Sequence, residues 1–297
     1  MKQGTIKLFG LLAGFTLVMG NIKEMQAIPV TDPVVDDFRV DQSDSTVGFF
    51  GSPNSVDKSV NQETEKLKDS IFDDGTTTLP NEGERNVRLE AVGTVSSAFA
   101  SSAYKIGDDA TVNKDQLEHF LGSNTKGQST LTLQYDGADG GFSTPPTTDP
   151  VDNPIKEDVR TDVNGLTNNV FAIRDFTLES GTADSIEIKV ELFDTDGDSI
   201  TVVDAEGGTT GFFDVTGESG DIFIALQESD ITQPPGIDTD GRFFEDAGSN
   251  HFDFNEVAAL EFSTRMTVIN GNEAQVSVNE IGFERIPFEA ESSIGIA

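Results

Sequence analysis

Strict alternation of apolar and polar residues in several short stretches constrains the fold of this chain more than any other feature. In Ser185–Phe193 every second residue is apolar, and Glu187, Lys189 and Glu191 lie between them. A period of two with one polar face is typical of antiparallel sheet, whose other face meets a core. The same alternation is found in Asn86–Val92, Ser129–Tyr135 and Ala274–Phe283.

A change of phase interrupts the alternation in Ala274–Phe283. Val276 and Val278 share one phase, whereas Ile281 and Phe283 share the other. Such a shift within a strand usually marks a bulge, so we predict one here.

Weaker strand signals, separated by Gly, Asp and Asn, fill much of the remaining chain. They are Val34–Val40, Thr46–Phe50, Val170–Leu178, Ile200–Val203, Thr210–Val215, Asp221–Leu226 and Ala258–Met266. Helix signals are confined to one or two turns at Asp115–Leu121 and at Asp253–Ala258. Many short strands with turn residues between them predict an all-β fold, a jelly-roll-like antiparallel β-sandwich of about ten strands.

Three polar segments resist assignment to strands: Gly51–Glu84, Phe142–Asn169 and Ser229–Gly248. We interpret them as long acidic loops of one sandwich, because strand signals flank each of them. The expected organisation is a signal peptide at 1–27, a single β-sandwich domain at 28–286 and a C-terminal tail at 287–297.

Residues 1–27 have the three zones of a secretory signal peptide. Lys2 and Lys7 are basic, and Leu8–Met19 is an uncharged apolar run. A short polar stretch then ends at Ala27. The apolar run is shorter than the roughly 20 residues of a membrane span, which favours cleavage after Ala27 over retention as an anchor. We therefore expect a secreted, extracellular or cell-surface protein with no stable membrane span in the mature chain.

Charge and composition exclude several classes of function. The 297-residue chain has 53 Asp and Glu against 19 Lys and Arg, a net charge of -34. A nucleic-acid-binding protein needs a basic face, and an anionic lipid surface is disfavoured for the same reason. With Cys 0 and His 2, thiol catalysis, zinc ribbons and multi-histidine metal centres are excluded too. Repulsion among so many negative charges destabilises the folded chain in dilute buffer. We therefore predict either bound divalent cations or an organism that lives in high salt.

Several short strings of the sequence resemble bacterial exosortase-sorted proteins of the PEP-CTERM type, especially cyanobacterial ones. They are Val35–Phe38, Gly83–Arg85, Tyr135–Gly140, Leu192–Ile200, Phe252–Phe262 and Val276–Glu284. Pro287–Ala297 is similar to the start of the sorting signal of that family, without its apolar span and basic tail. The layout also resembles galactose-binding-type jelly rolls. The resemblance implies a secreted β-sandwich associated with the envelope or the extracellular polysaccharide, and it implies no activity.

Acidic turns are the candidate metal sites. Asp194, Asp196 and Asp198 alternate on a tight turn, where their oxygens could converge on Ca²⁺ as a structural cofactor. The Asp-Gly pair in this string is also a strong hairpin signal, and we favour a plain turn over a calcium-assisted one. Asp238 and Asp240 repeat part of the pattern in a long loop, where calcium is the alternative to a plain acidic loop, which we favour.

Asp36 and Asp37 stand at a strand start, a position from which jelly-roll calcium sites often draw ligands. For these two residues we favour a solvated strand start.

Aromatic usage bears on sugar binding. The chain has 22 Phe, 2 Tyr and no Trp, whereas sugar platforms usually use Trp or Tyr. Most Phe side chains are therefore expected in the core, with Tyr104 and Tyr135 as the only candidate phenol platforms. Three pairs of consecutive Phe residues are Phe49-Phe50, Phe212-Phe213 and Phe243-Phe244. In a strand one ring of each pair must face outward, and we favour loops that cover this ring over a surface for a partner.

The favoured function is a secreted, non-enzymatic envelope or extracellular-matrix-associated β-sandwich protein, with structural Ca²⁺ as the one cofactor considered. The alternative is a glycan-binding module, which would need a concave face where Asp, Asn and Arg contact sugar hydroxyls. A polysaccharide hydrolase is less favoured, because the chain has no catalytic motif and we assign no catalytic residue. The expected partners are extracellular polysaccharide or envelope components.

Overall fold

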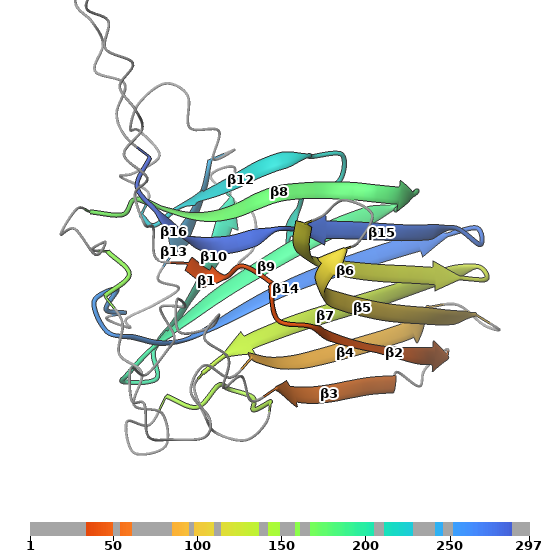
Figure 1. The fold of residues 1–297 in the computed structure, drawn as a ribbon, viewed down its shortest axis with the longest axis horizontal. Coiled ribbons are helices and arrows are strands. Elements are labelled where there is room, and N and C mark those ends of the chain that lie inside the picture. Colours follow the sequence, from red (N-terminus) through yellow and green to blue (C-terminus); the bar gives the residue numbers. More distant parts are fainter. Residues whose placement is uncertain are drawn as a thin grey trace, which may run out of the picture. The chain divides into compact units, whose positions relative to one another are not determined.

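The alternating stretches form strands in the computed structural model (Figure 1). The structure describes residues 34–49, 54–60, 85–94, 98–109, 114–136, 142–148, 158–160, 167–204, 211–227, 241–245 and 252–286. Within these ranges the chain forms sixteen strands and no helix. All of the strands fall within one compact unit, Asp32–Ala297. The predicted signal peptide at 1–27 and the tail at 287–297 lie outside the described residues.

The strands form two layers that overlie one another in Figure 1. The β8 layer consists of β12 (Gly220–Ala225), β8 (Val170–Gly181), β16 (Glu280–Glu284), β15 (Glu273–Val278), β1 (Val34–Asp36), β6 (Lys114–Ser123), β5 (Phe99–Asp109) and β2 (Gln42–Phe49). The β9 layer consists of β13 (Arg242–Glu245), β10 (Ser199–Asp204), β9 (Ser185–Asp194), β14 (Val257–Ile269), β7 (Lys126–Tyr135), β4 (Arg85–Gly93) and β3 (Asn54–Val60), with β11 (Phe213–Asp214) beside β9. A short parallel contact between β12 and β13 joins the layers, and all other described pairs are antiparallel. The fold is thus the all-β sandwich that the alternation predicts.

In the middle of the β8 layer, β16 and β15 lie end to end. On one side β8 pairs with both of them, with β16 through Val170–Arg174 and with β15 through Thr177–Gly181. On the other side β16 pairs with β1, whereas β15 pairs with β6. At the passage from β15 to β16, the strand paired with β8 therefore changes from β15 to β16, and the strand on the far side changes from β6 to β1.

The core lies between the two layers and is filled by the apolar phase of each strand. Leu131 and Ile188 of the β9 layer are fully buried, as is Leu117 of the β8 layer. The imidazole of His119 on β6 crosses this core. Its Nδ1 lies 2.8 Å from the hydroxyl of Thr264 on β14, and its Nε2 lies 2.8 Å from the hydroxyl of Ser129.

The predicted solvated strand start at Asp36 is wrong. Asp36 is buried because its carboxylate pairs with the guanidinium of Arg85, which has no exposed surface, at 2.6 Å. The hydroxyl of Tyr135 donates a second hydrogen bond to Asp36 at 2.8 Å, and the backbone N–H of Phe38 donates a third at 2.7 Å. Three donors replace the water that the carboxylate loses.

The helix predicted at Asp115–Leu121 is also wrong, because this segment lies within β6 and pairs with β5 and β15. Pairing on both edges overrides the helix propensity of a short segment. The second predicted helical segment forms a turn before β14 begins at Val257. Two predicted loops contain strands, β3 in Gly51–Glu84 and β13 in Ser229–Gly248.

Candidate functional site

The change of phase predicted in Ala274–Phe283 occurs at Asn279, between β15 and β16. Val278 on one side and Ile281 on the other are both buried in the core. The two residues between them, Asn279 and Glu280, consequently both face away from the core and are half-buried. A strand without this slip would present one outward side chain here instead of two.

The neighbouring strand β8 slips at the same level. Ile173 and Phe176 are buried, and Arg174 and Asp175 between them face outward. The slip requires a left-handed backbone at Asp175, with φ of 52°, a conformation that Asp tolerates better than most residues. The backbone N–H of Asn279 donates to the carbonyl of Arg174 at 3.0 Å, which holds the two slips side by side.

A third irregularity lies at the end of β1. Phe38 is fully buried with φ of 56°, so Asp37 and Arg39 on either side of it face outward. The Nε of Arg39 lies 2.9 Å from a carboxylate oxygen of Asp37 and 3.8 Å from one of Asp115, at the start of β6. This ion-paired group faces the two slips of β8 and β15–β16.

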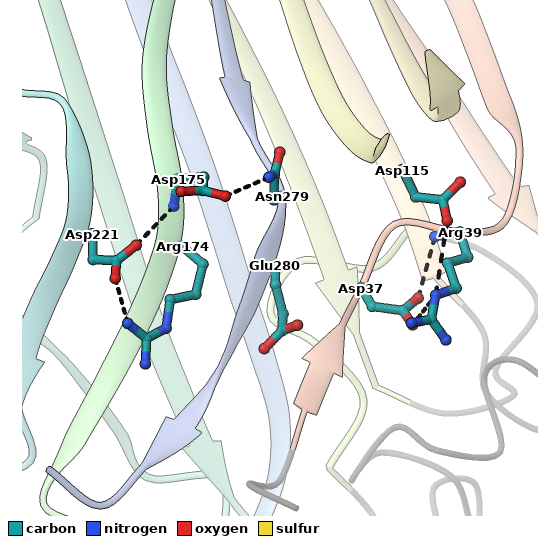
Figure 2. Close-up of a pocket in the computed structure, with 8 residues that line it drawn as sticks. All are labelled: Asp37, Arg39, Asp115, Arg174, Asp175, Asp221, Asn279 and Glu280. Carbon is teal, nitrogen blue, oxygen red and sulfur yellow. Dashed lines mark hydrogen bonds and ion pairs between the residues drawn. The ribbon is translucent and has the colours of Figure 1, made fainter. Parts of the chain in front are cut away.

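Together these residues enclose a hollow that we call the corner pocket (Figure 2). It has a volume of about 530 Å³ and is lined by Asp37, Arg39, Asp115, Arg174, Asp175, Asp221, Asn279 and Glu280. Figure 2 shows Glu280 between the group around Arg174 and the group around Arg39. Two arginines and an asparagine thus share one hollow with five carboxyl groups.

Arg174 forms the rigid wall of the corner pocket. Its guanidinium pairs with the carboxylates of Asp221 and Glu284 and lies 5.0 Å from the ring centre of Phe223. Asp221 also accepts the backbone N–H of Asp175 at 3.0 Å, and Asp175 accepts the side-chain amide of Asn279 at 2.7 Å. These bonds fix the wall before any ligand arrives.

Glu280 differs from the other acids of the pocket. Its backbone pairs with β8, but its carboxylate has no hydrogen bond or ion pair with any residue that the structure describes. Burial raises the pKa of its carboxyl, and the nearby carboxylate of Glu284 raises it further. Burial also raises the pKa of Asp37 across the pocket. A carboxyl group held in this way can accept a hydrogen bond when ionised and donate one when protonated.

A second hollow, the sheet groove, has a volume of about 540 Å³ and crosses β2, β5, β6 and β15. The side chains that line it combine apolar and polar groups. They are Ser45, Thr46, Val47, Ser101, Ser102, Ala103, Phe120, Leu121, Glu273, Ala274 and Gln275, with Gly122. Unlike the corner pocket, the groove has a single charged residue in its lining.

The predicted acidic turn joins β9 to β10, with Gly197 at φ of 85°. Asp194 is buried, and one of its carboxylate oxygens accepts the backbone N–H groups of Asp196 at 3.0 Å and Asp198 at 2.9 Å. Its other oxygen accepts the N–H of Asp253 at 3.2 Å. These bonds are those of a side-chain-capped turn, and calcium binding by Asp194, Asp196 and Asp198 stays a prediction.

Within the described ranges, no three acidic or histidine side chains are grouped to hold a metal ion. Asp238 and Asp240 lie outside those ranges, so the calcium site there stays a prediction. The only two candidate phenol platforms for a sugar, Tyr104 and Tyr135, are both buried in the core. Phe49, by contrast, is 56% exposed on the edge strand β2, and its cross-strand partner Phe99 is 41% exposed.

No family model and no curated protein matches the chain. Among solved structures it is similar to an agarase, with 12% identity and a TM-score of 0.31 over 57% of this chain and 23% of that one. The chain thus spans about a quarter of the length of the agarases it matches.

Two carbohydrate-binding modules are also similar. A family 11 module of a cellulosomal cellulase from Clostridium thermocellum has 12% identity and a TM-score of 0.29, over 87% of this chain and 97% of that one. A promiscuous module of the β-sandwich superfamily has 9% identity and a TM-score of 0.30, over 84% and 100%. We assign no ligand from these similarities, and the sandwich rests on its own strand pairing.

Proposed function

We propose that this chain is a secreted, non-catalytic β-sandwich module that binds a hydroxyl-rich glycan of the envelope or extracellular matrix in the corner pocket. One observation carries the proposal: the guanidinium of Arg39 and the unpaired carboxyl of Glu280 lie in one pocket of about 530 Å³. Each sugar hydroxyl both donates and accepts hydrogen bonds, so its binding site needs donors and acceptors together.

The pocket also provides the concave surface of Asp, Asn and Arg that a glycan site without aromatic platforms needs. The wall around Arg174 is held by bonds within the protein, which lowers the entropy lost on binding. Polar bonds would orient the sugar here, because both tyrosines are buried in the core. Loss of any one bond should then weaken binding markedly, since a buried partner is left unpaired.

Affinity electrophoresis of the full chain through gels that contain xylan, barley β-glucan, laminarin, agarose or alginate tests the proposal. We expect retardation by at least one polymer and a loss of about tenfold or more in affinity for Glu280→Gln and for Arg39→Gln. Glu90→Gln, an exposed acid on β4, is the matched control and should bind as the wild type does. Absence of retardation in every gel contradicts the proposal, and release of reducing sugar contradicts its non-catalytic part.

Secretion and calcium stabilisation belong to the same proposal and have their own tests. We expect the mature protein in the culture medium or at the cell surface to begin at Ile28, which N-terminal sequencing measures. We also expect millimolar Ca²⁺ to raise the melting temperature above that in NaCl or Mg²⁺ of equal ionic strength, since a ligand of the native state stabilises it. Equal rises in all three salts would contradict a specific calcium site.

A further inference from the structure

We infer that the corner pocket is one end of a longer track that continues into the sheet groove, so that the chain binds an internal segment of a linear polysaccharide. The inference rests on the proposed function, and it adds the class of ligand and the path the ligand takes. The track has two binding parts, the corner pocket and the sheet groove, and a buried polar bridge on β6 and β15 joins them.

Both hollows lie on the same face of the β8 layer. Along β15, Ala274, Val276 and Val278 are buried in the core, so Gln275 and Asn279 face the opposite way. Gln275 lines the sheet groove, whereas Asn279 lines the corner pocket. Four residues of strand separate them, which corresponds to about 13 Å.

A hydrogen-bonded bridge connects the two hollows. Asp115 of the corner pocket is followed on β6 by Gln116, whose side-chain amide donates to the carboxylate of Glu118 at 2.9 Å. The same carboxylate oxygen accepts the amide of Gln275 from the sheet groove at 3.1 Å. Both Gln116 and Glu118 are buried, so these bonds hold β6 and β15 rigid between the hollows, and the ligand would contact the two hollows and not the bridge.

The sheet groove suits the middle of a sugar chain, whose rings have apolar C–H faces and hydroxyl edges. Phe120, Ala103 and Val47 give it apolar surface, and the hydroxyls of Ser45 and Ser101 are polar groups beside them. The groove crosses three strand spacings from β15 to β2, about 14 Å. Beyond Val47 the same outward phase leads to the exposed Phe49–Phe99 pair.

Gly122 allows the groove to be filled without disturbing the sandwich. A Cβ at this position would lie 3.5 Å from the Ser101 hydroxyl oxygen and 3.6 Å from Cγ of Glu273, which are ordinary contact distances. The variant Gly122→Leu should therefore fold and block the groove, while leaving the corner pocket intact. Thr130→Leu on β7, at a half-buried position of the β9 layer, is the matched control for added apolar surface.

The test uses the full chain and the polymer that retards it most in the gels named above. Disaccharide and hexasaccharide from that polymer compete for binding, and calorimetry gives their affinities. We expect the hexasaccharide to bind at least about tenfold more tightly than the disaccharide. Gly122→Leu should remove this difference and leave disaccharide binding unchanged, whereas Glu280→Gln should weaken both ligands. Thr130→Leu should match the wild type.

Equal affinities for the two lengths, or unchanged hexasaccharide binding by Gly122→Leu, would overturn the track and leave the proposed function standing. Failure of every gel to retard the chain would overturn the proposed function as well. Melting curves of Gly122→Leu accompany the titrations, and a second variant, Phe120→Ser, opens the groove instead of blocking it and should also lower hexasaccharide affinity alone.

Discussion

Arg85 shows how one buried charge fixes the start of the sandwich. Its guanidinium reaches Asp36 on β1, the carbonyl of Val40 at 2.8 Å and the amide oxygen of Gln42 at 3.2 Å. One side chain on β4 thereby holds the whole segment from β1 to β2. That segment also carries Asp37 and Arg39. The contacts of Arg85 therefore stabilise the core and also position two residues of the corner pocket.

We expect Arg85→Ala to lower the free energy of unfolding by about 3–5 kcal/mol, because it leaves the buried Asp36 carboxylate without its ionic partner. Urea unfolding measures the change. Arg88→Ala, whose guanidinium lies over the ring of Phe142, should cost less than about 1 kcal/mol. Similar losses of unfolding free energy for the two variants would show that the buried Arg85–Asp36 pair stabilises the fold no more than an exposed arginine does.

His119 makes stability depend on pH. Burial lowers the pKa of its imidazole from 6.5 to about 3 in the folded protein. Between these values the unfolded chain binds a proton that the folded chain does not, so stability is lost as the pH falls below 6.5. The loss from this one group approaches about 1.4 kcal/mol per pH unit.

Urea unfolding at pH 7, 6 and 5 measures this dependence in the wild type and in His119→Gln, whose amide cannot titrate. We expect the wild type to lose more stability than the variant over this range. The carboxyl groups titrate alike in both proteins and cancel in the comparison. Parallel pH profiles would be inconsistent with a neutral buried imidazole.

At the scale of the strand, the slip at Asn279 determines which residues of β16 face the core. Ile281 and Phe283 are buried only because two consecutive outward residues precede them. Deletion of Asn279 would restore strict alternation with Ile281 and Phe283 still facing the core, but it would leave one outward side chain here instead of two.

The deletion also shifts β16 by one residue along β8 and removes the bond from the Asn279 N–H to the Arg174 carbonyl, so it should cost about 2–3 kcal/mol. Asn279→Ala, which keeps the slip and removes the bond to Asp175, should cost only about 1 kcal/mol. Thermal and urea unfolding of the two variants distinguish register from hydrogen bonding. Equal destabilisation by both changes would contradict this account of β15 and β16.

Elements with strict alternation could be predicted from the sequence, because the period alone states which face is buried. Ser185–Phe193 became β9 almost residue for residue. β6 could not, since Asp115–Leu121 contains good helix formers and its strand pairing comes from partners distant in the chain. The polar segments that contain β3 and β13 show no alternation. These two strands form because they pair with β4 and β10, which the local sequence does not indicate.

Only one feature of the candidate site could be predicted from the sequence. The change of phase near Asn279 pointed to an irregularity, but not to its alignment with Asp175 on β8. Arg39, Arg174 and Glu280 carried no motif, because they meet through a register that only the folded sheet defines. A search for polar residues at phase changes of alternating strands would have found Asn279 and Glu280.

For the whole molecule, the net charge of -34 sets the response to salt. We expect the melting temperature to rise between 10 mM and 500 mM NaCl, because the screening length falls from about 30 Å to below about 8 Å and weakens self-repulsion. Differential scanning fluorimetry measures the rise. Sucrose at equal osmolality is the control, and a flat or falling response to NaCl would contradict the expectation.

The antiparallel pairing of β1 with β16 determines how the module would yield under mechanical tension. Val34 pairs with Gly282, so the chain enters and leaves the sandwich at the same end of two adjacent strands. A force that pulls the chain apart at these points loads the hydrogen bonds one after another, and β1 peels away first. Because Asp37 and Arg39 follow β1 directly, tension would dismantle one wall of the corner pocket while the core beneath still holds, and under the proposed function a bound glycan would be released before the module unfolds.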